Sequence, residues 1–458
     1  MKVLIIAFAF PPANVIGAVH VGKLARYLDR RDHDVRVLTT DLVEDRSLPL
    51  EISRDRVIYT DYLERKSWFG VVARPFRNRS NLALNSIGAD DPARSRPPRG
   101  ALRRSLRRHY LGLTHIPDMR AAWMNAALPA GRRLIEEWRP DIIYASAPPH
   151  TGLVIARRLA RSFRIPWVAG LRDLWVDNPY YQEPGWRRPV DVMLEAWTLR
   201  NAARLVTVSP IWAEQLRRRH DKPTEVVYNG YAAEDFPPPP ERAEPGKVLT
   251  IRYLGSIYQG FRDPSPLFSA IALLPQRLRR CVLVEFYGDD CEAVLDTAAA
   301  HGVPDVVAVR QRVPYRRALE LQMHADVLLL LQWNDRRDEG NLPAKLFEYL
   351  YARRPILFLG YEEGIAAQFV SERGAGLVSN DPARIAGQLQ GWIADKLQGH
   401  LERLDPSVCR GLSREEQYEK LEHLFGDVLR GGQGNAASHP ALADVHFPDR
   451  LPSTNRSR

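Results

Sequence analysis

The chain has little cysteine and no long hydrophobic run, and both absences narrow the class of protein. Its three cysteines, Cys281, Cys291 and Cys409, are too few and too scattered for a disulfide framework or a zinc site. They fit a reduced, cytoplasmic compartment. No apolar stretch reaches the length of a membrane span. With 458 residues, 45% of them hydrophobic and 26% charged, the composition is that of a globular protein of two to three domains.

Several sequence signatures are also missing or misplaced. The N-terminal MKVLIIAFAFPP lacks the small-residue cleavage site of a signal peptide and continues into a helical pattern, so we interpret it as a strand. The loop that follows is not the G-x-G-x-x-G dinucleotide fingerprint. Asp32-His33-Asp34 spells a metal-binding D-x-D but precedes a strand, and Asp289-Asp290 lacks a third partner. We therefore predict no cofactor and no catalytic metal.

Two series of short apolar runs alternate with helical patterns, which indicates parallel sheets covered by helices on both faces. The predicted strands of the first series are 3–8, 35–39, 142–145, 167–171, 205–208 and 225–228, with helices at 19–30, 121–138, 152–163 and 192–203. Those of the second are 249–254, 282–287, 306–309, 325–331 and 356–359, with helices at 266–274, 316–324, 382–397 and 414–429. The fold class predicted is α/β, with two Rossmann-like, doubly wound domains facing a cleft.

Composition marks the domain boundaries. The segment FPPPPERAEPG cannot continue a helix or a central strand, so residues 236–247 are predicted to link a domain at 1–235 to a domain at 248–412. The polar, aperiodic residues 431–458 are predicted to be disordered.

Positive charge is concentrated in one insert. Between Asp61 and His115 there are twelve Lys and Arg residues and four Asp and Glu residues, an excess of +8 in a chain with a net charge of +10. Trp68, Phe69 and Phe76 add apolar anchors. This mixture favours an anionic membrane surface. The alternatives are an arginine-rich solvated loop and nucleic acid, for which no binding motif accompanies the charge.

The most informative stretch is NLPAKLFEYLYARRPIL at 341–357. It places Lys345 and Glu348 near the start of a helix, whose free N–H groups and dipole favour an anion. Lys345 adds a point charge for phosphate, and Glu348 can accept hydrogen bonds from a sugar diol. The pattern predicts a site for a nucleotide diphosphate and its ribose. The alternative is an ordinary amphipathic helix with Lys and Glu on its solvated face.

Other candidates also follow strands, at the edge where ligands bind in such sheets. Gly17 permits close backbone approach by a ligand, the alternative being a plain turn. His150, Arg172 and Asp173 are catalytic candidates, and the adjacent Arg172 and Asp173 could bind acceptor hydroxyls or orient a neighbour. The alternatives are a structural histidine and a loop-stabilising charge pair. In the second series, Gly255 keeps a loop open and Arg262 can clamp a phosphate, unless it is a surface arginine.

Taken together, four segments resemble the GT-B-fold glycosyltransferases, and within them the large retaining glycosyltransferase family 4. These segments are 10–40, 140–175, 205–236 and 341–357. The resemblance implies an acceptor domain at 1–235, a nucleotide-sugar domain at 248–412 and a helix at 413–430 that crosses back to the first domain. It implies front-face transfer with retention, in which Arg262 and Lys345 stabilise the leaving diphosphate, Glu348 holds the ribose and Gly17 approaches the donor. Bacterial members that build surface polysaccharide or lipopolysaccharide are the most similar.

The chain departs from the family pattern at two points. The family often has a glutamate eight residues before Glu348, where this chain has Gly340, and Glu339 lies one residue away. A glycine-arginine pair that opens the phosphate loop is here Gly255-Ser256. The leading function is therefore a glycosyltransferase that uses a nucleotide-sugar donor and a lipid-linked or glycan acceptor at the inner membrane face. The alternatives are a GT-B-fold sugar-nucleotide epimerase, a non-catalytic scaffold and, least favoured, a nucleic-acid-binding protein.

Overall fold

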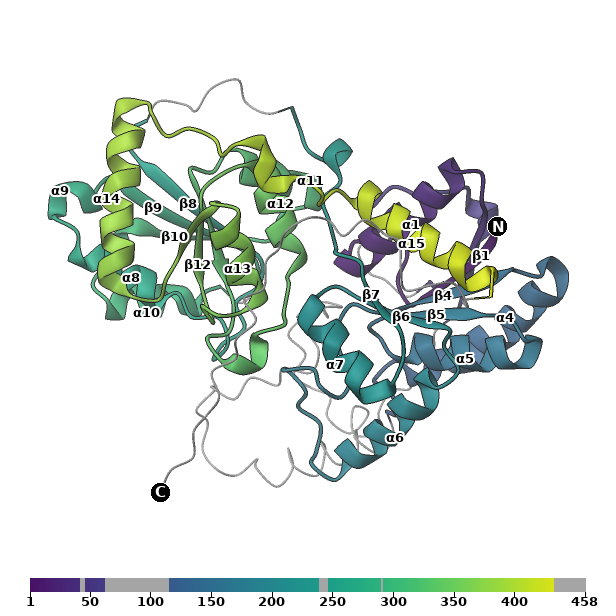
Figure 1. Cartoon of the computed structure of the whole chain (residues 1–458). Coiled ribbons are helices and arrows are strands. Elements are labelled where there is room, and N and C mark those ends of the chain that lie inside the picture. Colours follow the sequence, from purple (N-terminus) through teal and green to yellow (C-terminus); the bar gives the residue numbers. More distant parts are fainter. Residues whose placement is uncertain (42–45, 62–114, 239–245, 290, 432–458) are drawn as a thin grey trace, which may run out of the picture.

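Two parallel sheets organise the chain (Figure 1). The structure is a computed structural model, and it describes residues 1–41, 46–61, 115–238, 246–289 and 291–431. Most of the predicted basic insert and nearly all of the predicted disordered tail therefore lie outside the described residues. The predicted α/β fold class with two doubly wound domains is confirmed.

The first sheet has the strand order β3-β2-β1-β4-β5-β6-β7, and every pair in it is parallel. Its strands are β1 (Lys2–Ala7), β2 (Asp34–Thr40), β3 (Val57–Thr60), β4 (Ile142–Ala147), β5 (Trp167–Leu171), β6 (Arg204–Thr207) and β7 (Thr224–Val226). The helices between them are α1 (Ile16–Arg30), α4 (Met124–Trp138), α5 (Thr151–Phe163), α6 (Arg187–Leu199) and α7 (Pro210–His220).

The second sheet repeats the arrangement with the order β10-β9-β8-β11-β12-β13. Its strands are β8 (Leu249–Leu254), β9 (Val282–Tyr287), β10 (Val307–Arg310), β11 (Val327–Leu331), β12 (Ile356–Leu359) and β13 (Gly376–Val378). The main helices are α8 (Ser265–Leu273), α10 (Ala293–Ala300), α11 (Tyr315–Met323), α12 (Ala344–Ala352), α13 (Ile365–Glu372) and α14 (Pro382–Gln398).

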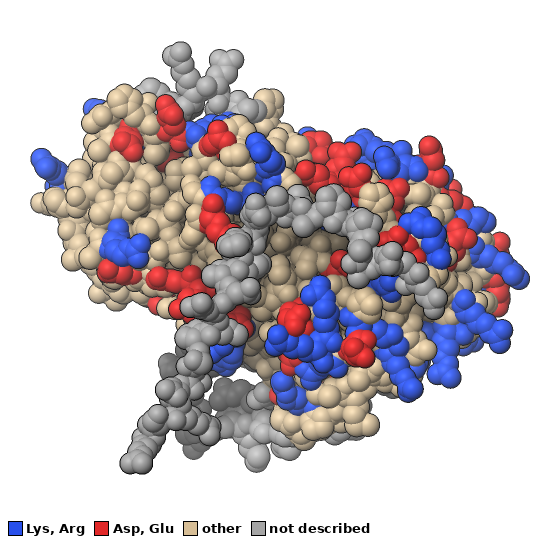
Figure 2. All heavy atoms as spheres, viewed as in Figure 1, with Lys and Arg blue, Asp and Glu red and all other residues tan. Residues whose placement is uncertain are grey.

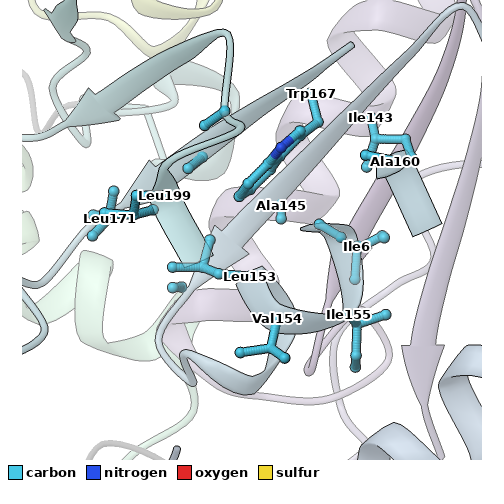
Figure 3. Close-up of a cluster of buried hydrophobic side chains, with 14 of the residues drawn as sticks. Ile6, Ile143, Ala145, Leu153, Val154, Ile155, Ala160, Trp167, Leu171 and Leu199 are labelled. Carbon is cyan, nitrogen blue, oxygen red and sulfur yellow. The ribbon is translucent and has the colours of Figure 1, made fainter. Parts of the chain in front are cut away.

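The central strands are apolar along their length because helices cover both faces of each sheet. All residues of β4, β5, β11 and β12 are buried. Figure 3 shows part of the core on one face of the first sheet, where Ile6, Ile143 and Trp167 from three strands meet Leu153 of α5. Asp34 of the D-x-D sequence accepts a hydrogen bond from Trp138 Nε1 at 2.6 Å, so this carboxylate has a structural partner away from the cleft.

The final helix, α15 (Arg414–Leu429), returns to the first domain and lies beside α1 (Figure 1). A capping box between Ser413 and Glu416 starts it. Tyr418 donates a hydrogen bond to the His20 carbonyl at 2.9 Å, and Glu422 pairs with His33 at 2.8 Å. Helix α15 therefore ties the two domains together and carries its first residue, Arg414, to the boundary between them.

Both strand orders reverse at one point, between β1 and β4 in the first sheet and between β8 and β11 in the second. Loops that leave neighbouring strands in opposite directions open a crevice there. The loops after β1, β8 and β11 lead to Gly17, Gly255 and the start of α12. No helix among the described residues has the length and apolarity to cross a membrane.

Candidate active site

A cavity of about 130 Å³ lies between the two domains. Side chains from the first domain and from α15 line one part of its wall, and the residues that open α12 line the other. The lining residues are Ile16, His20, Arg172, Asp173, Asn229, Asn341, Leu342, Pro343, Ala344 and Arg414. Two helices, α1 and α12, begin at this cavity, so their free N–H groups and dipoles favour an anion in it.

The loop after β5 brings two predicted residues, Arg172 and Asp173, into the cavity wall. The Arg172 guanidinium lies over Gly17, where an added Cβ would be 2.9 Å from Nη2. Glycine at position 17 thus makes room for an arginine of its own domain. Arg172 Nε contacts Ser146 Oγ at 3.3 Å. Burial raises the pKa of Asp173, and Arg172 and His150 oppose that rise.

His150 lies behind this wall, outside the cavity lining. Its ring stacks on Trp175 with centroids 4.6 Å apart, and its Nε2 has no hydrogen-bond partner among the described residues. Burial lowers the pKa of His150, while Asp118, Glu195 and Asp173 act in the opposite direction. The structure therefore does not bring His150 itself to the cavity.

The second domain contributes a cluster around Lys345. Its Nζ donates a hydrogen bond to the Leu254 carbonyl at 2.7 Å and lies 4.4 Å from the centre of the Tyr253 ring. Gly255 has φ +144°, and a Cβ there would be 2.4 Å from Nζ. The loop after β8 can hold this lysine only because position 255 is glycine. Burial and the nearby Arg262 lower the pKa of Lys345 to about 7.

Arg262 and Lys345 both contact the Tyr253 side chain. Arg262 Nη1 donates to Tyr253 Oη at 3.1 Å and to the Ser256 carbonyl at 2.8 Å, and its guanidinium lies 4.1 Å from the centre of the Tyr258 ring. Both predicted phosphate-binding cations therefore lie beside the loop after β8: Arg262 belongs to it, and Lys345 reaches the start of it from α12. Arg262 is held in place by groups of that loop.

Glu348 is buried on α12, one turn after Lys345. Tyr315 donates to its Oε1 at 3.2 Å and Gln322 to its Oε2 at 3.0 Å. Burial raises the pKa of Glu348, and Gln322, Arg414 and Tyr315 limit the rise. Both carboxylate oxygens thus have protein donors, and each retains a lone pair for a ligand hydroxyl.

The structure explains the glycine at position 340. Trp212 of α7 lies against Gly340, where an added Cβ would be 2.4 Å from Cδ1 of the indole ring. Trp212 belongs to the core of the first domain and is 4% exposed. The neighbouring Glu339 points elsewhere and contacts Arg336 at 3.6 Å. An aromatic side chain of the first domain therefore fills the space beside the position of the family's first glutamate.

Two polar residues of the cavity wall, Arg414 and His20, were not among the sequence candidates. Arg414 is 4% exposed, donates from Nε to the Asn229 carbonyl at 3.3 Å and lies 3.9 Å from Asp235. Burial lowers its pKa, but Tyr315, Tyr418 and Glu348 outweigh that effect and raise it. His20 of α1 is buried, and its Nδ1 has no hydrogen-bond partner among the described residues. Only the capping box near Arg414 and the Asn229-Gly230 turn gave a local signal at these positions.

The site is therefore rich in cations, with Arg172, Arg414, Lys345 and Arg262 in or beside the boundary between domains. Within the described ranges, no group of three or more His, Cys, Asp or Glu side chains is arranged to hold a metal ion. The site can bind an anion through its fixed positive charges and through the N-termini of two helices.

Solved structures share this architecture along nearly the whole chain. Sucrose-phosphate synthase from Thermosynechococcus elongatus matches with a TM-score of 0.63 at 14% identity over 94% of this chain and 100% of that one. Anabaena HepE in complex with UDP matches with a TM-score of 0.59 at 12% identity over 93% and 100%. WaaG, a glycosyltransferase involved in lipopolysaccharide biosynthesis, matches with a TM-score of 0.53 at 14% identity over 94% and 100%.

The same architecture also occurs in a UDP-N-acetylglucosamine 2-epimerase, with a TM-score of 0.50 at 14% identity over 95% of this chain and 99% of that one. At these identities the likeness shows the fold alone. No curated protein matches the sequence. The class defined by the two sheets, the cleft and the returning helix is the GT-B fold.

The family match adds the activity class. Residues 17–232 match the family model described as the glycosyl transferase 4-like domain. The amino-terminal domain belongs to that family, and the chain as a whole has the GT-B fold of glycosyltransferases. The resemblance to family 4 of the GT-B glycosyltransferases is thereby confirmed.

Proposed function

We propose that this chain transfers a sugar from a nucleotide-diphosphate sugar to a lipid-linked or glycan acceptor in the synthesis of a cell-surface polysaccharide. The observation that carries the proposal is the interdomain cavity, where the N-terminus of α12 meets Arg172 and Arg414. A diphosphate at that helix end would lie beside Lys345. An acceptor hydroxyl from the other side of the cleft would meet Arg172 and Asp173, which are offered by the family-matched domain.

In this scheme the protein acts mainly by stabilising charge. As the bond from the sugar to the diphosphate breaks, negative charge grows on the leaving phosphate, and fixed cations close to it lower the barrier. Lys345 and Arg262 are assigned that role, and Glu348 is assigned to the ribose hydroxyls. Retention by front-face attack, without a protein nucleophile or a metal, follows from the family resemblance. Gly17 shapes the cleft because the absence of a side chain at this position leaves room for the Arg172 guanidinium.

A screen of nucleotides tests the donor assignment. A ligand that binds only the folded protein raises its stability by about 2.7 kcal/mol at a concentration of 100 Kd. We expect a rise in melting temperature with one member of a panel of UDP, GDP, ADP, CMP and dTDP, and a further rise with its sugar conjugate. A folded sample that responds to none of them would contradict the transferase assignment and favour a scaffold role. The observation that favours a scaffold role is the glycine at position 340, where the family often has a glutamate.

The ribose assignment gives a sharper prediction. Glu348→Gln removes the charge but keeps the shape, and should weaken nucleotide binding by about 1.5–3 kcal/mol, roughly 10- to 150-fold, because hydrogen bonds to a charged group are lost. Isothermal titration with the nucleotide found in the screen measures the change. The matched control is Glu320→Gln on the adjacent α11, an exposed glutamate that pairs with Arg317. Equal affinities of the two variants would show that Glu348 does not hold the ribose.

The proposed location is the cytoplasmic face of the membrane, with the basic insert at 61–115 on anionic lipid. That insert's cations supply most of the net positive charge of the chain. Deletion of 68–108 should lower binding to vesicles that contain phosphatidylglycerol, measured by co-sedimentation at two salt concentrations. Undiminished binding of the deletion variant would contradict the role of the insert. A sugar-nucleotide epimerase would share the fold but needs no acceptor and no such insert.

A further inference from the structure

Helix α6 exposes apolar side chains along one side. Trp186, directly before the helix, and Val190, Met193 and Trp197 follow one another at intervals of four, three and four residues. That spacing puts them on one side of the helix. They are exposed by 39%, 40%, 73% and 40%, respectively. Pro189 and Ala196 are also exposed, so most of the exposed residues of α6 are apolar, and Arg188 is the charged one among them.

The acidic residues of α6 face inward. Asp191 pairs with Arg187 at 3.1 Å and accepts a hydrogen bond from Tyr181 Oη at 2.7 Å. Glu195 contacts His220 at 3.3 Å, and the four side chains of these two ion pairs are at most 5% exposed. A helix on the surface of a globular protein usually directs its polar residues to water and its apolar residues inward. In α6 the acidic side chains are buried and the exposed residues are mostly apolar, which is the reverse of the usual arrangement for a helix in contact with water.

The surroundings of this face are cationic. The Arg157 guanidinium lies 3.4 Å from the centre of the Trp197 ring. Arg188 and Arg200 on or beside α6, and Arg158 and Arg161 on α5, are exposed. Repulsion from Arg161, Arg158 and Arg200 adds to burial in lowering the pKa of Arg157, so these charges are near one another. Figure 2 shows the uncharged surface over α6, with Lys and Arg side chains gathered beside it.

We propose that the exposed face of α6, formed by Trp186, Val190, Met193 and Trp197, docks on an anionic phospholipid bilayer. Tryptophan favours the interface between headgroups and acyl chains, and a long, flexible methionine at the centre can enter the acyl region. The surrounding arginines then reach the lipid phosphates. This surface is separate from the insert at 61–115, and it would set how the cleft is oriented over the membrane.

The test uses the full chain and vesicles of defined composition. Wild-type protein should co-sediment with vesicles of phosphatidylcholine and phosphatidylglycerol in a 7:3 ratio, and less with phosphatidylcholine alone. Met193→Asp should lower the binding constant for the mixed vesicles about tenfold or more, because a charge at the centre of the face opposes insertion. Leu273→Asp is the matched control: Leu273 is an exposed leucine on α8 of the other domain, 60% exposed. It should bind as wild type does.

Three results would overturn the proposal. One is equal vesicle binding by Met193→Asp and Leu273→Asp. Another is equal binding of wild type to neutral and anionic vesicles. The third is a change of oligomeric state in Met193→Asp without a change in vesicle binding, which would assign the face to a second copy of the chain. Trp197→Ser repeats the measurement at the end of the face if Met193→Asp has a lowered melting temperature. No substrate is needed, so the result is independent of the proposed transferase activity.

Discussion

Replacing Lys345 by methionine is expected to lower kcat by about 10²–10³-fold, the usual effect of removing one donor that stabilises charge in a transition state. Methionine keeps the length and apolar body of the side chain but cannot be charged. Lys345 is the second residue of α12, and its Nζ donates a hydrogen bond at 2.7 Å to the carbonyl of Leu254, the last residue of β8. No flexible cation replaces it easily, because Arg262 is already bonded to Ser256 and Tyr253.

The same residue predicts a pH dependence. Burial, assisted by Arg262, lowers the pKa of Lys345 to about 7. Below that pH the ammonium is charged and attracts a diphosphate; as pH rises through about 7, the free protein loses the proton and with it part of its affinity. Nucleotide binding should therefore weaken from pH 6 to pH 8, with proton uptake on binding near pH 7. Titration calorimetry in buffers of different ionisation enthalpy measures that uptake.

A second lysine provides the control. Lys222 also donates to a backbone carbonyl, that of Ala202 at 3.0 Å, but lies at the other end of the first domain's strands. Lys222→Met should leave both kcat and the pH dependence of nucleotide binding unchanged. A Lys345→Met variant with full kcat and the wild-type pH profile would contradict the assignment of Lys345 to the diphosphate.

The buried strands and the residues that follow them were predictable from the sequence, because near-continuous apolar runs such as β5, β9 and β12 have few competing interpretations. Two edge strands, β3 and β13, were not predicted, since they have only four and three residues. Helix α7 was also not predicted, although Ser209-Pro210 is a pair typical of a helix start. It begins there with Pro210 at its first position.

For the site, local signals led to Lys345, Glu348, Gly255 and Arg172, each near a strand end or a helix start. Arg414, His20 and Trp212 were missed because what makes them notable is contact between distant segments. Arg414 reaches the carbonyl of Asn229, 185 residues away in the sequence. No local pattern encodes such a contact. The sequence singled out position 340 as a departure from the family pattern, but not the side chain of the other domain that fills its surroundings.

The contact between Trp212 and Gly340 leads to the second prediction with a large expected effect. Trp212→Ala should lower the free energy of unfolding by about 3–5 kcal/mol, as truncation of a buried tryptophan usually does. The indole is 4% exposed and joins the first domain's core to Gly340 before α12. Part of the loss should therefore appear in the site. We expect weaker nucleotide binding, because the segment Asn341–Ala344 loses its support from α7. Urea unfolding followed by circular dichroism measures the stability.

A double-mutant cycle isolates this contact from general damage to the core. Gly340→Ala places a methyl group 2.4 Å from the indole in the wild-type arrangement. It should cost about 1–3 kcal/mol, the usual cost of overpacking. In the Trp212→Ala background the same substitution should cost much less, because only Ile211 Cγ2, at 3.2 Å, remains close to the added methyl group. Gly387→Ala in α14, where a Cβ meets no atom within 4 Å, should be neutral or stabilising in both backgrounds. An equal cost of Gly340→Ala with and without Trp212 would mean that the tryptophan does not fill this space in solution. Position 340 would then have room for the family's glutamate, and the absence of that carboxylate would need a functional explanation.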